Sequence, residues 1–115
     1  MRIIESFPIS SLHPKQLRSL IYDAYNNFTD SSVLPIEHLE NNQYLMNEHS
    51  GPTASFKDLA LQLMPKIFQN GTKDEKSKYT FLVATSGDTG PAVLSGFEDS
   101  NIPVFILYPK NGVRY

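Results

Sequence analysis

Cysteine is absent from this chain of 115 residues, which excludes disulfide bonds, thiolate nucleophiles and zinc sites built on thiolates. Long apolar runs are also missing, so we expect no segment that spans a membrane. The formal net charge is -2, which makes nucleic acid an unfavourable partner. Residues 1–16 contain only a brief apolar run interrupted by Glu5, so we expect no signal peptide and a cytoplasmic location.

The residues that are present have the composition of a folded protein, with 40% hydrophobic, 19% charged and 11% aromatic residues. A chain of this length forms one domain at most and buries about two-thirds of its unfolded surface. We therefore expect a small hydrophobic core rather than a disordered segment.

Helical periodicity occurs twice in the first part of the chain. Apolar residues recur at helical spacing from Pro14 to Phe28, and Pro14 is suited to a first helical position. A second helix is predicted from Ser55, with Ser55 as N-cap and Asp58 completing a capping box. Pro65 lies inside this second pattern and should kink the helix or end it early. The predicted buried face of the second helix comprises Phe56, Leu59, Ala60, Leu63, Met64, Ile67 and Phe68.

Extended structure is expected around residues 34–36 and 44–49, and more clearly in two later segments. The segments 79–85, "YTFLVAT", and 103–108, "PVFILY", carry no charge and are typical of strands buried on both faces. Between them, residues 91–97 predict a short helix whose inward residues are Val93, Leu94 and Phe97. This order predicts an α/β fold with a parallel βαβ unit.

The loop "TSGDTG", residues 85–90, joins the first strand of that unit to its helix. Open α/β sheets usually bind ligands at this position. Gly87 and Gly90 would let the backbone turn its N–H groups toward one point, which favours an anion. A turn whose glycines serve geometry alone explains the same spacing equally well. Asp88 is the unexpected member, because a carboxylate repels an anion unless it is protonated or directed at another group.

Lys57 lies in the first turn of the second predicted helix, where the positive end of the helix dipole disfavours an ammonium group. The dipole and partial burial would make the neutral amine more accessible. A neutral amine is what a lysine needs to form an imine. The alternative is a surface lysine on the polar side of an amphipathic helix, which is the commoner case for a lysine chosen at random.

Two segments taken together resemble a known family. The sequences "HSGPTASFKDLALQ", 49–62, and "VATSGDTGPA", 83–92, are similar to the paired signatures of threonine synthase, a fold type II enzyme family that uses pyridoxal 5'-phosphate (PLP). Related fold type II enzymes typically have asparagine at the position of Asp88, so this residue favours threonine synthase. One difference is Ser50, which separates His49 from Gly51 in the family's His-Gly-Pro-Thr element and could shift that loop slightly.

The resemblance implies a role for each motif residue. Lys57 would form an imine with PLP and then move protons as a free amine. Phe56 would anchor the helix in the core, and Asp58 would cap it. Asp88 would approach the ring hydroxyl of the cofactor. The loop that holds the substrate carboxylate would comprise Thr85, Ser86, Gly87, Asp88 and Thr89, and no metal site is predicted.

The implied reaction is elimination of phosphate from O-phospho-L-homoserine and addition of water to give L-threonine, with PLP as electron sink. Residues 1–115 would be a partial N-terminal region: an additional N-terminal helix, the PLP lysine and the βαβ unit. The family's glycine-rich phosphate loop, its partner for the pyridine nitrogen and its second domain are not among these residues. We therefore expect a fragment that binds PLP poorly and does not turn over. A non-catalytic interaction module and a related phospholyase are the alternatives.

Overall fold

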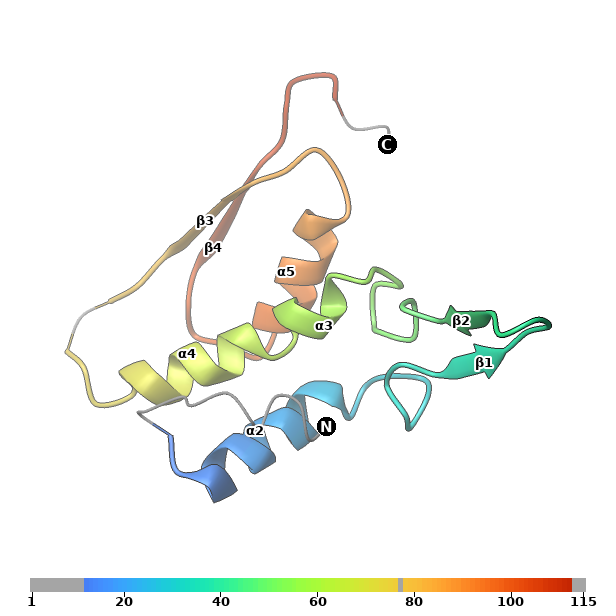
Figure 1. The fold of residues 1–115 in the computed structure, drawn as a ribbon. Coiled ribbons are helices and arrows are strands. Elements are labelled where there is room, and N and C mark those ends of the chain that lie inside the picture. The colour runs from blue at the N-terminus through green and yellow to red at the C-terminus, as the bar shows by residue number, and fades with distance from the viewer. Residues whose placement is uncertain (1–11, 77, 113–115) are drawn as a thin grey trace.

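The fold of this chain combines helices with two small sheets. The computed structural model describes residues 12–76 and 78–112, whose arrangement is shown in Figure 1. In chain order the elements are α2 (Pro14–Tyr25), β1 (Ile36–His38), β2 (Tyr44–Met46), α3 (Asp58–Leu61), α4 (Met64–Thr72), β3 (Phe81–Ala84), α5 (Thr89–Phe97) and β4 (Val104–Leu107). None of the helices in these two ranges is long and apolar enough to cross a membrane.

Helix α2 begins at Pro14, as the sequence predicts, and a capping box closes its first turn. The His13 Nδ1 atom accepts the Lys15 N–H at 3.3 Å, and the Gln16 side chain accepts the His13 N–H at 3.1 Å. The helix ends at Tyr25, three residues before the predicted end at Phe28. The N-terminal boundary of α2 is therefore set by its capping residues, whereas its C-terminal boundary lies before the end of the apolar pattern.

The hydrophobic core lies where α2 packs against the start of α4. Leu17, Ile21 and Ala24 of α2 cluster there with Leu63. The Tyr25 hydroxyl donates to the Leu59 carbonyl at 2.7 Å, which joins α2 to α3. A tyrosine phenol is protonated and able to donate at neutral pH, and burial raises the pKa of Tyr25 further.

The second predicted helix is divided into α3 and α4. Helix α3 ends at Leu61 and α4 begins at Met64, with Pro65 buried in its first turn. The prediction that Pro65 ends the regular helix early is therefore confirmed. Proline is tolerated in a first helical turn because its missing N–H has no partner there in any case.

The predicted start of that helix is wrong. The N-cap of α3 is Lys57, without a side-chain capping bond, so Ser55 is not the N-cap. Asp58 does not complete a capping box, because its carboxylate accepts hydrogen bonds from Thr53 instead. Phe56 lies in the turn before the helix and is 59% exposed, so it does not anchor the helix in the core. Ala60 is also exposed, whereas Leu63 is the buried member of the predicted stripe.

The predicted parallel βαβ unit is confirmed. Strands β3 and β4 pair in parallel, with Phe81 opposite Val104 and Ala84 opposite Leu107. Helix α5 lies between them in sequence and packs against one face of the sheet, where the Phe81 and Phe97 ring centroids are 4.5 Å apart. The shorter strands β1 and β2 form a separate antiparallel hairpin, which projects away from the helices (Figure 1).

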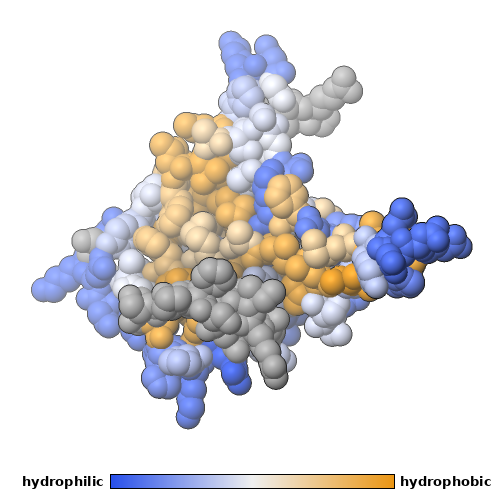
Figure 2. Space-filling model, in the orientation of Figure 1, coloured by the Kyte–Doolittle hydropathy of each residue, from blue (hydrophilic) through white to orange (hydrophobic). Residues whose placement is uncertain are grey.

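The strands of the parallel sheet are not buried on both faces. Leu82 is 67% exposed, Phe105 is 58% exposed and Leu107 is 53% exposed. Their strand neighbours on the α5 side are only half-buried, because the described sheet has two strands and one covering helix. Leu94 of α5 is also 50% exposed, which corrects its predicted inward position. In Figure 2 hydrophobic surface gathers over the region of this sheet, whereas the tip of the β1–β2 hairpin is hydrophilic.

Candidate functional site

Lys57 is half-buried at the start of α3, and its backbone is held in a helical turn. Its N–H donates to the Ser55 hydroxyl at 3.3 Å, and its carbonyl accepts the Leu61 N–H at 2.9 Å. The Nζ atom lies 5.3 Å from the centroid of the exposed Phe56 ring. Helix α3 has only four residues, so the helix-dipole argument has less force at Lys57 than the sequence pattern suggested.

The segment before the lysine forms a closed loop around the Asp58 carboxylate. Asp58 is 0% exposed. One carboxylate oxygen accepts the Thr53 N–H at 2.8 Å, and the other accepts the Thr53 hydroxyl at 2.7 Å. Gly51 lies directly against this carboxylate, because a Cβ added there would be 2.5 Å from the Asp58 Cβ atom. The buried carboxylate thus closes the loop that leads to Lys57.

Ser50, the extra residue in the His-Gly-Pro-Thr element, anchors the other end of this loop. Its carbonyl accepts the Thr29 N–H at 2.8 Å and the Thr29 hydroxyl at 3.1 Å. Its own hydroxyl donates to the Val33 carbonyl, and the residue is buried. Sequence reasoning missed this anchoring function, and a serine among small loop residues gives no signal of it.

The loop 85–90 continues from β3 into the first turn of α5. Thr85 extends the sheet, since its N–H donates to the Leu107 carbonyl at 3.0 Å, and its hydroxyl accepts the Gly87 N–H at 3.1 Å. Asp88 is the exposed N-cap of α5 without a side-chain capping bond. Within the described ranges, the N–H groups of Asp88 and Thr89 donate to no other residue. These two N–H groups remain available to an acceptor outside the chain.

The glycines of this loop act differently from the prediction. None of the described glycines has a positive φ, so the loop does not form a nest of alternating backbone conformations. Any anion would instead face the N-terminal turn of α5, with the Thr85, Ser86 and Thr89 side chains nearby in sequence. Ser86 and Gly87 are exposed, while Thr85 and Thr89 are half-buried. The loop keeps the donors of an anion site without the predicted backbone geometry.

Gly90 is required for close packing at the end of β4. A Cβ added to Gly90 would lie 1.9 Å from the Tyr108 hydroxyl oxygen. Tyr108 follows β4 and is 43% exposed, so its ring can rotate toward solvent. The tyrosine thus covers the first turn of α5, next to the candidate anion site.

Replacing Gly90 with alanine should therefore destabilise the chain by about 1 kcal/mol, because Tyr108 must move aside. In a Tyr108→Ala background the same change should stabilise by about 0.5–1 kcal/mol, since alanine is the better helix residue. Urea unfolding of the four proteins measures this coupling. An equal effect of Gly90→Ala in both backgrounds would show that Tyr108 does not pack there.

Helices α3 and α5 are in direct contact, which brings together the elements that carry Lys57 and the loop 85–90. The Gln62 amide donates to the Ala92 carbonyl at 3.4 Å. Gly96 of α5 packs against the backbone of α3, because an added Cβ would lie 2.0 Å from the Leu61 carbonyl oxygen. No hydrogen bond or ring contact among the described residues joins the Lys57 side chain to the loop itself. Helices α3 and α5 thus lie together, but within the described ranges neither kind of interaction connects the Lys57 side chain to the loop 85–90.

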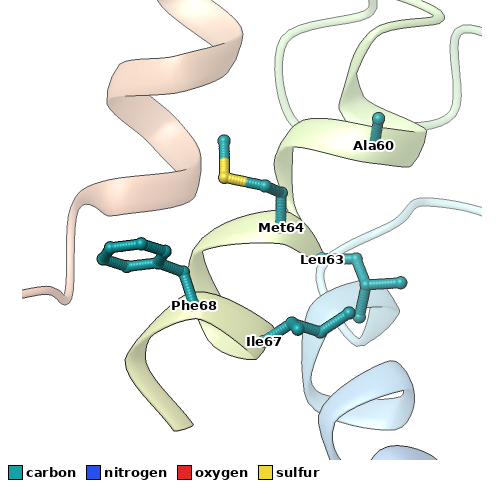
Figure 3. Close-up of a pocket in the computed structure, with 5 residues that line it drawn as sticks. All are labelled: Ala60, Leu63, Met64, Ile67 and Phe68. Atoms are coloured by element: carbon teal, nitrogen blue, oxygen red, sulfur yellow. The ribbon is translucent and has the colours of Figure 1, made fainter. Parts of the chain in front are cut away.

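Two cavities lie elsewhere on these helices. An apolar cavity of about 320 Å³ runs along α3 and α4 (Figure 3), and its lining residues are Ala60, Leu63, Met64, Ile67 and Phe68. A polar cavity of about 150 Å³ includes Gln62, Lys66 and Glu98 in its lining. Neither lining contains Lys57 or a residue of the loop 85–90. Among the described side chains, no group of three or more His, Asp or Glu residues is placed to hold a metal ion.

The comparisons with known proteins match both the sequence and the fold. Threonine synthase-like 1 of Homo sapiens is 47% identical over 105 residues, covering 85% of this chain and 14% of that protein. Threonine synthase of Pseudomonas aeruginosa is 30% identical over 113 residues, covering 97% of this chain and 24% of that protein. The crystal structure of PLP-bound threonine synthase from Brucella melitensis superimposes with a TM-score of 0.79 at 30% identity, covering 88% of this chain and 22% of that one. No protein-family model matches the chain.

The fold is therefore a mixed α/β unit of the kind found within threonine synthases. By sequence and by structure, the chain is similar to threonine synthases and threonine synthase-like proteins over most of its own length. It spans between 14% and 24% of the length of these relatives.

Proposed function

We propose that this chain supplies the PLP lysine and the substrate-carboxylate loop of a threonine synthase-type lyase. The reaction proposed is conversion of O-phospho-L-homoserine and water to L-threonine and phosphate, in a cytoplasmic protein. The observation that carries the proposal is the direct packing of α3 on α5. Lys57 is the N-cap of α3, and the loop 85–90 leads into the first turn of α5. The similarity to a PLP-bound threonine synthase supports the choice of cofactor.

The residues present fit part of the PLP molecule. Lys57 as a residue is half-buried and its backbone is held in a helical turn, which suits a side chain that must meet the cofactor aldehyde and later hold a proton at Nζ. PLP, when bound, supplies an electron sink for carbanions next to its imine carbon. The exposed Asp88 carboxylate is the chain's candidate for the cofactor's ring hydroxyl. No residue of this chain is assigned to the cofactor phosphate.

The loop 85–90 fits the carboxylate of an amino-acid substrate. The N–H groups of Asp88 and Thr89 are unused in the first turn of α5, and helix N-termini attract anions. The Ser86 hydroxyl is exposed beside them and adds an uncharged donor. These groups would hold the substrate carboxylate by hydrogen bonds without adding a charged side chain.

Reduction with borohydride tests the assignment of Lys57. The 115-residue chain is incubated with PLP, reduced, digested and mapped by mass spectrometry. We expect a pyridoxyl adduct at Lys57 in excess of each of the other six lysines. A Lys57→Arg chain is the control, in which labelling of those six lysines should be unchanged. Uniform labelling, or none at Lys57, contradicts the proposal for this chain.

A related phospholyase is the second candidate. The 47% identity to threonine synthase-like 1, against 30% to threonine synthase of Pseudomonas aeruginosa, means that the comparisons do not single out threonine synthase itself. A non-catalytic interaction module is the third, and the exposed apolar side chains of Leu82, Phe105 and Leu107 favour that reading. A Lys57→Ala substitution separates catalysis from interaction. If a biological effect of the chain survives this substitution, the effect does not depend on the amine.

A further inference from the structure

Asp58 is the most completely buried ionisable side chain of the described residues, and it directly follows the proposed PLP lysine. Both of its carboxylate oxygens accept hydrogen bonds from Thr53, one from the N–H and one from the hydroxyl. Burying a carboxylate requires such partners, because an unpaired buried charge is strongly unfavourable. This arrangement goes beyond the helix cap that the motif suggested.

The two hydrogen bonds from Thr53 to Asp58 close a loop of backbone that contains Lys57. Two backbone hydrogen bonds add to this loop. The N–H of Ala54 donates to the Gly51 carbonyl at 3.1 Å, and the N–H of Asp58 donates to the Ser55 carbonyl at 2.9 Å. Ala54 has a φ of 54°, a left-handed conformation that is unfavourable for alanine. A strained residue persists only where its surroundings hold it. Ala54 lies between Thr53 and Asp58 in the chain, so the two hydrogen bonds from Thr53 to Asp58 enclose this strained residue.

We propose that Asp58 is a positioning residue for the Lys57 amine. Through Thr53 it fixes the backbone from which the lysine side chain leaves, and it thereby sets the direction of Nζ. The inference rests on the proposed function of Lys57 as the PLP lysine. Gly51 contributes by leaving room for the carboxylate, since a Cβ there would lie 2.5 Å from an Asp58 carboxylate oxygen.

The test removes one hydrogen bond without changing the shape of the loop. Thr53→Val deletes the hydroxyl that donates to Asp58, and Thr53→Ser retains it. Tyr25→Phe is the matched control, because it removes a hydroxyl that donates to Leu59 in the same helix but does not contact the loop. Circular dichroism and urea unfolding establish that each variant is folded under the labelling conditions.

The first measurement is borohydride trapping of PLP, expressed as labelling of Lys57 relative to the mean of the other six lysines. Thr53→Val should lower this ratio about tenfold, the factor associated with loss of a hydrogen bond to a charged group. Thr53→Ser should restore it to within about twofold, and Tyr25→Phe should leave it unchanged. Equal reductions in Thr53→Val and Tyr25→Phe would overturn the proposal, because general loosening of the fold would explain both. If the wild-type chain labels Lys57 preferentially, an unchanged ratio in Thr53→Val would overturn it as well.

The second measurement uses no PLP, so that the two proposals fail separately. Reductive methylation with formaldehyde reports the accessibility of each lysine amine. Thr53→Val should move Lys57 methylation toward the value of the exposed Lys73, and Thr53→Ser should restore it. If methylation follows this pattern while the wild-type chain shows no PLP preference for Lys57, the PLP assignment fails and the positioning role of Asp58 remains. If neither reagent responds to Thr53→Val, the positioning role is refuted.

Discussion

Replacing Gly96 with alanine is expected to destabilise the chain by about 2–3 kcal/mol, because the new methyl group has no space between α3 and α5. Its Cβ atom would lie 2.0 Å from the Leu61 carbonyl oxygen and 3.3 Å from the Pro65 ring. The obstacle is backbone, which cannot rotate away as a side chain does. The two helices must therefore separate, which lengthens the hydrogen bond from Gln62 to Ala92.

The matched control is Gly71→Ala in α4. An added Cβ at Gly71 meets no atom within 4 Å, so only the helical preference of alanine remains. This variant should stabilise the chain by about 0.5–1 kcal/mol. Urea unfolding of both variants measures the difference, with the same m-value expected if the denatured states match. Similar free energies of unfolding for the two variants would show that α3 and α5 are not packed at Gly96.

If α3 and α5 carry the two halves of one site, Gly96→Ala should also reduce PLP labelling of Lys57 under conditions where the chain is still folded. Gly71→Ala should not change it, because that glycine lies at the far end of α4. A loss of stability with unchanged labelling would separate the packing of these helices from the arrangement of the site.

The parts of the fold that the sequence predicts are those set by local chemistry. Pro14 defines the first turn of α2, and Pro65 interrupts the second helix, because proline restricts the backbone wherever it occurs. The strands β3 and β4 follow from two uncharged segments rich in β-branched residues. Their parallel pairing follows from the intervening helix, since a crossover of this length permits it.

Burial could not be predicted in the same way, because an apolar residue does not specify what covers it. Phe56 and Leu94 both fit helical stripes, yet Phe56 is 59% exposed and Leu94 is 50% exposed. Leu82 and Phe105 lie on the outer face of a sheet that only one described helix covers. The periodic pattern identifies an apolar face but does not predict which helix or strand covers that face.

In the candidate site, too, the sequence predicts some features and not others. The motifs located Lys57 and the loop 85–90, and the structure carries them on helices that touch. The partners of Asp58 and Ser50 were not predictable, because they depend on a loop that returns upon itself. The functional roles proposed for Lys57 and the loop come from the resemblance, and PLP labelling tests the role of Lys57.

Truncating Ile21 to alanine is the other large effect expected, at about 3–4 kcal/mol of lost stability. Ile21 is 1% exposed in the cluster that joins α2 to Leu63, so its removal leaves a cavity where two helices meet. Domains of ordinary size have only about 5–15 kcal/mol of stability in total, and a chain with this small a core belongs near the lower end.

Ile21→Val, which removes one methylene group, should cost about 1 kcal/mol. Tyr22→Ala is the control on the same helix, because Tyr22 is 64% exposed and its truncation should change stability by less than about 0.5 kcal/mol.

This substitution also tests how far the lysine depends on the core. Helix α2 packs in the core cluster against Leu63, which directly follows the C-cap of the lysine helix α3. Partial unfolding of α2 in the Ile21→Ala chain should therefore bring PLP labelling of Lys57 close to that of the other lysines, whereas Tyr22→Ala retains the preference. Thermal unfolding monitored by circular dichroism, together with mass mapping of the adduct, provides both measurements. If Ile21→Ala unfolds the core but Lys57 keeps its preferential labelling, the reactivity of this lysine comes from its local loop alone, and Asp58 with Thr53 is then sufficient to hold it.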